Sequence, residues 1–165
     1  MHRTITLMSI AVAACLLGAD ENPERAKPDE DLIQGIWRLV AAERNGVPTD
    51  FEEGLHVFFS GDKTGMTKGE KTANEASFKL HPKKKPKGID LSKKGDRRIA
   101  KGAYSLKGDT LKLCLPGGPD RDRPNELATK PGDGFTLLTL KRTHRKSNGQ
   151  YSREKVSGTF FRFGL

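Results

Sequence analysis

The chain has 165 residues and a formal net charge of +9, with 34% hydrophobic and 31% charged residues. This length and polarity allow one modest hydrophobic core and exclude a second domain of ordinary size. The excess of lysine and arginine makes an anionic partner a hypothesis to weigh against simple solubility.

The first nineteen residues differ in kind from the rest of the chain. Residues 1–4 carry one firm positive charge, residues 5–17 are apolar apart from Thr6 and Ser9, and the chain becomes polar at Asp20. This order predicts a signal peptide over residues 1–19 and an extracytoplasmic, secreted or periplasmic protein. The apolar run is shorter than the roughly 20 residues that a membrane span needs.

Two cleavage sites fit this segment. Cleavage after Ala19 removes the whole apolar run, whereas Val12-Ala13-Ala14-Cys15 resembles a bacterial lipobox. Cleavage at the second site leaves Cys15 as a lipidated N-terminus on a membrane surface. If Cys15 is removed instead, Cys114 is the only cysteine and an intramolecular disulfide is excluded.

Residues 20–31 are acidic and contain proline, which predicts a flexible linker. Residues 32–43 then place Trp37, Leu39 and Ala41 on one face of a strand, with Arg38 and Ala42 on the other face, and the strand ends in the Asn45-Gly46 turn. A helix is the competing interpretation of this run, and Gly35 and the turn weaken it.

Short alternating or apolar runs follow, separated by turn residues. We expect strands over residues 55–60, 64–67, 76–80, 89–91, 99–106, 110–115 and 135–140. Several short strands at fairly regular spacing predict an all-β fold, a sandwich or a barrel, over residues 32–142. Residues 143–165 form a basic tail that is either an extra strand or disordered.

Several segments, read in order, resemble a known family of small exported proteins. They are Gln34-Gly35-Ile36-Trp37 and residues 86–91, 108–114, 123–132 and 137–142. Together they resemble the planctomycete-type lipocalin-like domain family, whose function is unknown, over about residues 32–142. The Gly35-x-Trp37 pattern also looks like the Gly-x-Trp signature of lipocalins.

The resemblance implies a lipocalin-like, antiparallel up-and-down β-barrel. It also implies that Trp37 lies near the closed end of the barrel, packed under a basic residue that follows the last strand. Arg142 is the matching candidate and Lys141 the second. Such a cation–π stack contributes roughly 0.5–2 kcal/mol. The family brings no catalytic residues to this chain.

Basic residues cluster in one region, where few carboxylates balance them. The candidate polyanion patch is Lys83, Lys84, Lys85, Lys87, Lys93, Lys94, Arg97, Arg98 and Lys101. An anionic polymer or a membrane surface is a conceivable partner, although lysine-rich loops also serve solubility. Specific nucleic-acid binding is not expected, because aromatic residues are nearly absent between these charges.

Catalytic signatures are missing. His56, His81 and His144 lack ligand spacing, so no metal site is predicted, and no motif calls for a cofactor. Cys114 alternates away from the leucines of its strand and is either a reactive thiol or a small packing residue. A thiol-dependent enzyme therefore remains the weakest of three hypotheses, and we predict a protein that is not an enzyme.

A ligand cavity is the leading hypothesis. Small barrels either fill with side chains or enclose one small ligand. The expected inward residues, which either line such a cavity or pack the core, are Trp37, Phe59, Phe78, Tyr104 and Leu113. We therefore expect a non-catalytic binding module for a small apolar or amphipathic ligand, with an envelope or surface protein that binds polyanions as the alternative.

Overall fold

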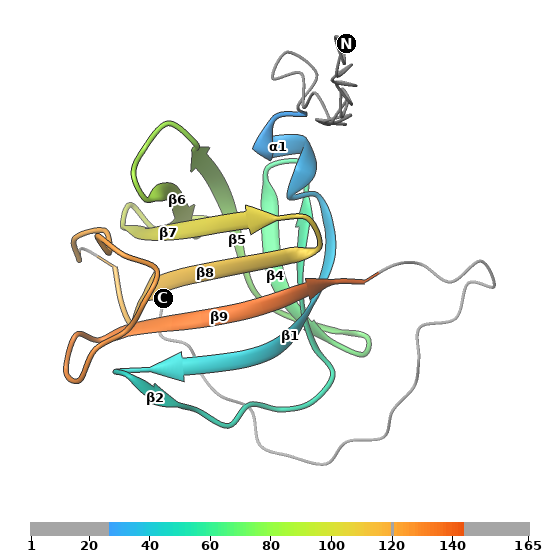
Figure 1. Cartoon of the computed structure of the whole chain (residues 1–165). Helices are drawn as coiled ribbons and strands as arrows, with labels where there is room; N and C mark the ends of the chain where they lie inside the picture. The colour runs from blue at the N-terminus through green and yellow to red at the C-terminus, as the bar shows by residue number, and fades with distance from the viewer. Residues whose placement is uncertain (1–26, 120, 144–165) are drawn as a thin grey trace, which may run out of the picture.

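The computed structural model describes residues 27–119 and 121–143 (Figure 1). The predicted signal peptide, the lipidation candidate Cys15, and residues 144–165 of the basic tail lie outside the described residues. So do residues 20–26 of the predicted linker.

One helical turn precedes nine strands. The elements are α1 (Asp29–Leu32), β1 (Gly35–Arg44), β2 (Val47–Pro48), β3 (Leu55–Ser60), β4 (Lys63–Lys68), β5 (Lys71–His81), β6 (Lys87–Ser92), β7 (Ile99–Lys107), β8 (Thr110–Pro116) and β9 (Phe135–Arg142). Every pairing is antiparallel.

The sheet closes on itself. Strands pair in the order β1-β3-β4-β5-β6-β7-β8-β9, and β9 then pairs with β1, while the short β2 extends β1 at its far end. The predicted all-β, single-domain, up-and-down antiparallel barrel is therefore confirmed, with eight strands in the closed ring. Closure leaves no long unpaired sheet edge among these eight strands.

The first run of the domain is a strand rather than a helix. Asn45 and Gly46 both have positive φ, 53° and 79°, as the tight turn between β1 and β2 requires. The ordered part starts earlier than expected, because Asp29 begins α1, whereas the sequence assigned residues 29–31 to a flexible linker. The reason is tertiary, since Asp29 binds Tyr104 and Lys87 of the barrel.

The two ends of the barrel differ. Because the strands run up and down, alternate turns gather at each end. We call the end that carries α1 the α1 end: Gln34 there exchanges two hydrogen bonds with the backbone of Gly61, in the β3–β4 turn. We call the opposite end the mouth; the β1–β2, β4–β5 and β6–β7 turns, residues 49–54 and the β8–β9 loop (residues 117–134) lie there.

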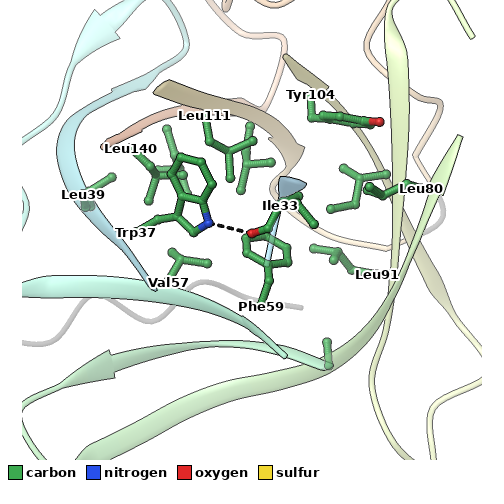
Figure 2. Close-up of a cluster of buried hydrophobic side chains, with 14 of the residues drawn as sticks. Ile33, Trp37, Leu39, Val57, Phe59, Leu80, Leu91, Tyr104, Leu111 and Leu140 are labelled. Atoms are coloured by element: carbon green, nitrogen blue, oxygen red, sulfur yellow. Dashed lines mark hydrogen bonds between the residues drawn. The ribbon is translucent and has the colours of Figure 1, made fainter. Parts of the chain in front are cut away.

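The core fills the barrel toward the α1 end. Figure 2 shows the buried Trp37 ring among Leu39, Val57, Leu111 and Leu140. Residues that pair across strands share a face, so the inward set follows from the register of the sheet. Burial of large apolar side chains contributes roughly 1.5–3 kcal/mol each, which makes this cluster the main stabilising feature of the fold.

Candidate ligand-binding site

Trp37 and Arg142 close the α1 end. The Trp37 indole Nε1 donates a 2.7 Å hydrogen bond to the carbonyl of Ile33, which follows α1 (Figure 2). The Arg142 guanidinium carbon lies 4.1 Å from the centre of the Trp37 ring. The same guanidinium donates to the carbonyls of Leu32 and Gln34. The structure thus brings together the two residues of the expected stack, and their role is to hold α1 against the barrel.

A polar cluster closes the same end from the other side. The Asp29 carboxylate accepts hydrogen bonds from the Tyr104 hydroxyl at 2.5 Å and the Lys87 ammonium at 2.7 Å. Burial raises the pKa of Tyr104 well above its usual range, and the hydrogen bond to Asp29 adds to the rise. Tyr104 is therefore a neutral donor that anchors α1, and it does not line a cavity at the mouth.

Two apolar cavities lie at the mouth. The larger, of about 70 Å³, is lined by inward residues of several strands, among them Phe59, Ile89, Leu91 and Leu113. The smaller, of about 50 Å³, lies between β1, residues 49–54 and β4, and Leu39, Phe51 and Leu55 line it. The larger cavity reaches as deep as Phe59, which pairs with Gly35 at the start of β1, so the interior is packed around Trp37 and contains two small cavities.

The expected cavity residues divide between core and cavity. Phe59 and Leu113 line the larger cavity, whereas Trp37, Phe78 and Tyr104 line neither of these two cavities. Phe78 instead packs edge-on against Phe59, with ring centres 5.0 Å apart. An alternating strand pattern identifies the inward face but gives no position along the barrel axis, and that position decides which residues meet a ligand.

Four side chains border both cavities: Arg44, Met66, Asn74 and Thr136. Arg44 Nε donates to the Thr136 hydroxyl at 3.3 Å, and the Asn74 amide nitrogen lies 4.0 Å from the Met66 sulfur. Arg44 and Thr136 are partners in the β1–β9 register, so they share the inward face. The sequence analysis did not single out these residues, because three of them are polar and the expected inward set was chosen among apolar and aromatic side chains.

The mouth also holds a buried charge. Glu52 is 7% exposed and lines the smaller cavity beside Lys68, whose ammonium lies 3.0 Å from Oε2. Lys68 is therefore the ion-pair partner of Oε2, whereas Oε1 has no hydrogen-bond partner. Residues 49–54 connect short strands and gave no sequence signal of this kind.

The candidate polyanion patch is spread along one side of the barrel. Lys83, Lys84 and Lys85 are exposed in the β5–β6 turn at the α1 end, whereas Lys93, Lys94, Arg97 and Arg98 lie in the β6–β7 connection at the mouth, with Lys101 on β7 between them. Lys87 does not belong to this patch, because its ammonium forms an ion pair with Asp29. Arg98 is paired with Asp96, which lowers the pKa of that carboxyl to about 2.

An internal ion cluster pins the β8–β9 loop to the outer face of the barrel. Arg123 donates to Asp90 and to the carbonyls of Ile89 and Gly102, and His81 Nε2 lies 2.9 Å from the other Asp90 oxygen. Gly88 leaves room for this guanidinium, since a Cβ there would lie 2.6 Å from Arg123 Nη1. These groups satisfy one another and are structural.

Cys114 lies beneath the same loop. It is fully buried, and its thiol contacts the carbonyl of Ala128 at 3.7 Å. Burial raises the pKa of the thiol to about 11, and the nearby carboxylates of Asp133, Glu126 and Glu43 add to the rise. A nucleophilic cysteine needs the opposite surroundings, with a lowered pKa and access to substrate. The position therefore fits a packing residue.

Among residues 27–119 and 121–143, no group of three or more potential metal ligands comes together. His56 Nδ1 contacts the carbonyl of Gly54, and His81 is occupied by Asp90; His144 is outside the described part. No helix in the same ranges has the length and apolar character of a membrane-spanning segment.

Comparison with known proteins finds no matching family model, no matching curated protein and no matching solved structure. The resemblance to the planctomycete-type family is not tested by these comparisons and stays a prediction.

Proposed function

We propose that this protein is an exported, non-catalytic binding module that holds a small apolar or amphipathic ligand at the mouth of its barrel. The observation that carries the proposal is the pair of apolar cavities at the end opposite α1. Ligand sites in barrels are typically apolar pockets with a few placed polar groups. Arg44, Glu52 and Thr136 are such groups here.

The size of the cavities limits the ligand. An engineered cavity of roughly 150 Å³ is large enough for benzene, whereas these two cavities have volumes of about 50 and 70 Å³. Each suits a short alkyl group. The ligand is therefore either a small molecule or a larger amphiphile of which only one apolar end enters the barrel.

Native mass spectrometry of the protein purified from its own envelope fraction tests the proposal. We expect a discrete added mass that is lost on denaturation, and the polypeptide mass also shows whether the N-terminus is processed at Cys15 or near Asp20. A bare polypeptide mass that acquires no small apolar compound on incubation would contradict the proposal.

Two neighbouring alanines on β1 supply a matched pair of variants. Ala42 lines the smaller cavity, whereas Ala41 is exposed. The sequence predicted the reverse, and that prediction is wrong because an irregularity of β1 between Leu39 and Ala41 shifts the register and exchanges the two faces. Ala42→Val fills part of the cavity, so we expect it to weaken ligand binding at least several-fold while leaving the fold intact. Ala41→Val should bind as the unchanged protein does. Equal binding by both variants would place the ligand elsewhere.

A further inference from the structure

The buried Glu52 carboxylate is the feature of the mouth that the fold itself does not explain. It lies in the wall of the smaller cavity, its side chain is 5% exposed, and its Oε1 has no hydrogen-bond partner. A carboxylate offers about four lone-pair positions, and buried polar atoms are nearly always hydrogen-bonded. Lys68 balances the charge, with its ammonium 3.0 Å from Oε2, but Oε1 keeps its acceptor capacity unused.

The surroundings of Glu52 limit what approaches it. Apolar side chains, including Leu39, Ala42, Phe51 and Leu55, form much of the cavity wall. A ligand that enters this cavity therefore places an apolar group near a carboxylate whose Oε1 has no hydrogen-bond donor. A ligand hydrogen-bond donor attached to that apolar group would satisfy Glu52.

The charges in the wall select among possible donors. Arg44, Lys68 and Lys71 are cationic, and Asp50 and Glu52 are the only carboxylates among the residues that line this cavity. A ligand ammonium would therefore enter a wall with an excess of positive charge, beside Lys68. A ligand carboxylate would bring no donor and would repel Glu52. A neutral hydroxyl avoids both costs.

We propose that the ligand is a neutral hydroxylated amphiphile whose hydroxyl donates to Glu52 while its alkyl part occupies the smaller cavity. This inference rests on the proposed function, since it assigns a ligand class to the same site. Glu52 is then the residue that determines specificity, and the cavity around it supplies apolar contact without distinguishing one alkyl compound from another.

Isomeric probes test the ligand class in the unchanged protein. 1-Pentanol and butyl methyl ether have the same atoms, but only the alcohol has a donor, and NMR titration of the Met66 methyl and the Glu52 amide reports binding at this cavity. We expect the alcohol to bind roughly ten- to a hundredfold more tightly, as a hydrogen bond to a charged acceptor allows. Pentylammonium and pentanoate should bind more weakly than the alcohol.

The outcomes separate the inference from the proposed function. Equal binding of alcohol and ether, or tighter binding of pentylammonium or pentanoate, would overturn the assignment of a hydroxylated ligand while leaving a binding module in place. If none of the four probes shifts the cavity resonances, the proposed function fails and the inference fails with it.

Two variants test whether Glu52 causes the preference for the alcohol over the ether. Glu52→Gln keeps the shape of the side chain but removes its charge, so we expect the preference for 1-pentanol over the ether to shrink several-fold. Asp50→Asn is the matched control, because Asp50 lines the same cavity but is exposed, and it should keep the preference. An unchanged preference in Glu52→Gln would overturn the role of Glu52. If Glu52→Gln does not fold, the series of probes on the unchanged protein decides the ligand class.

Discussion

At the scale of single residues, Asp90 shows how a half-buried charge stabilises this barrel. It lies on the outer face of β6, where its carboxylate forms hydrogen bonds with Arg123 of the β8–β9 loop and with His81 of β5. Burial alone raises the pKa of Asp90, but the hydrogen bonds from Arg123 and His81 outweigh it, so the pKa lies below the ordinary value of 3.8. The ionised form is therefore the one that the fold prefers.

Asp90→Asn should lower the free energy of unfolding at pH 7 by about 1–3 kcal/mol, because it removes a charged acceptor. An aspartate with a lowered pKa stabilises fully above its unfolded-state value, and this stabilisation disappears as pH falls through the folded-state value. Urea unfolding between pH 7 and pH 2 should therefore show the two proteins converging below about pH 4.

Asp96→Asn is the control for this comparison. Its carboxyl also has a lowered pKa, about 2, and is half-buried as Asp90 is, but its partner is the exposed Arg98, two residues away in the same β6–β7 connection. It should change stability little, since exposed ion pairs are weak. A stability difference for Asp90→Asn that stays constant down to pH 2 would show that the effect is not electrostatic.

At the scale of elements, α1 is a single helical turn that docking to the barrel must stabilise. A four-residue helix is not stable alone, and here Pro28 makes no side-chain cap. Arg142, at the end of β9, supplies what the turn lacks: it donates to the Leu32 and Gln34 carbonyls while covering Trp37. The first element therefore depends on the last strand.

Arg142→Lys should loosen this turn. Lysine keeps the charge but cannot donate to two carbonyls in the planar geometry of a guanidinium while stacking on an indole. We expect a loss of about 1–2 kcal/mol in urea unfolding and faster amide exchange at Leu32 and Ile33, whose amides bond to Pro28 and Asp29.

The control for Arg142→Lys is the opposite substitution at the neighbouring residue, Lys141→Arg. Lys141→Arg changes an exposed, outward residue whose ammonium bonds to Thr110, so it should leave both measurements nearly unchanged. Equal effects from the two variants would mean that the α1 end is sensitive to any change in β9 rather than to the stack.

At the scale of the whole molecule, closure of the barrel and its covering loop produce one protected interior. The β8–β9 loop crosses the outer face and is tied to the β1–β2 turn by hydrogen bonds from Gly46 to Thr129 and from Gly134 to Asn45. Cys114 lies beneath this loop, so the reactivity of its thiol reports whether the β8–β9 loop detaches while the barrel stays folded.

In a Cys15→Ser variant, Cys114 should react with a disulfide reagent at pH 8 at least about a hundredfold more slowly than a free thiol, because burial excludes the reagent and the thiol pKa is about 11. The same protein unfolded in urea should react at the ordinary rate. Rapid reaction of the native protein would show an accessible thiol and revive the thiol-dependent hypothesis.

The pattern of the sequence was sufficient for the all-β class and the approximate strands, whereas the up-and-down barrel, rather than a sandwich, was expected from the resemblance. Alternation and turn chemistry are local, so Asn45-Gly46 and the run over residues 55–60 identify a turn and a strand without any distant contact. The stack of Arg142 on Trp37 came from a resemblance rather than from a pattern. Strand lengths were less predictable, as β5 extends to eleven residues where five were expected.

Only the tertiary structure decided where the barrel is hollow, because that depends on contacts between residues far apart in the chain. Lys87 reads as one lysine of a basic run until α1 places Asp29 beside it. Glu52 reads as a solvated loop acid until the mouth buries it next to Lys68. Alternation predicts which face a residue occupies, whereas long-range packing determines its depth in the barrel and therefore whether it meets core, solvent or ligand.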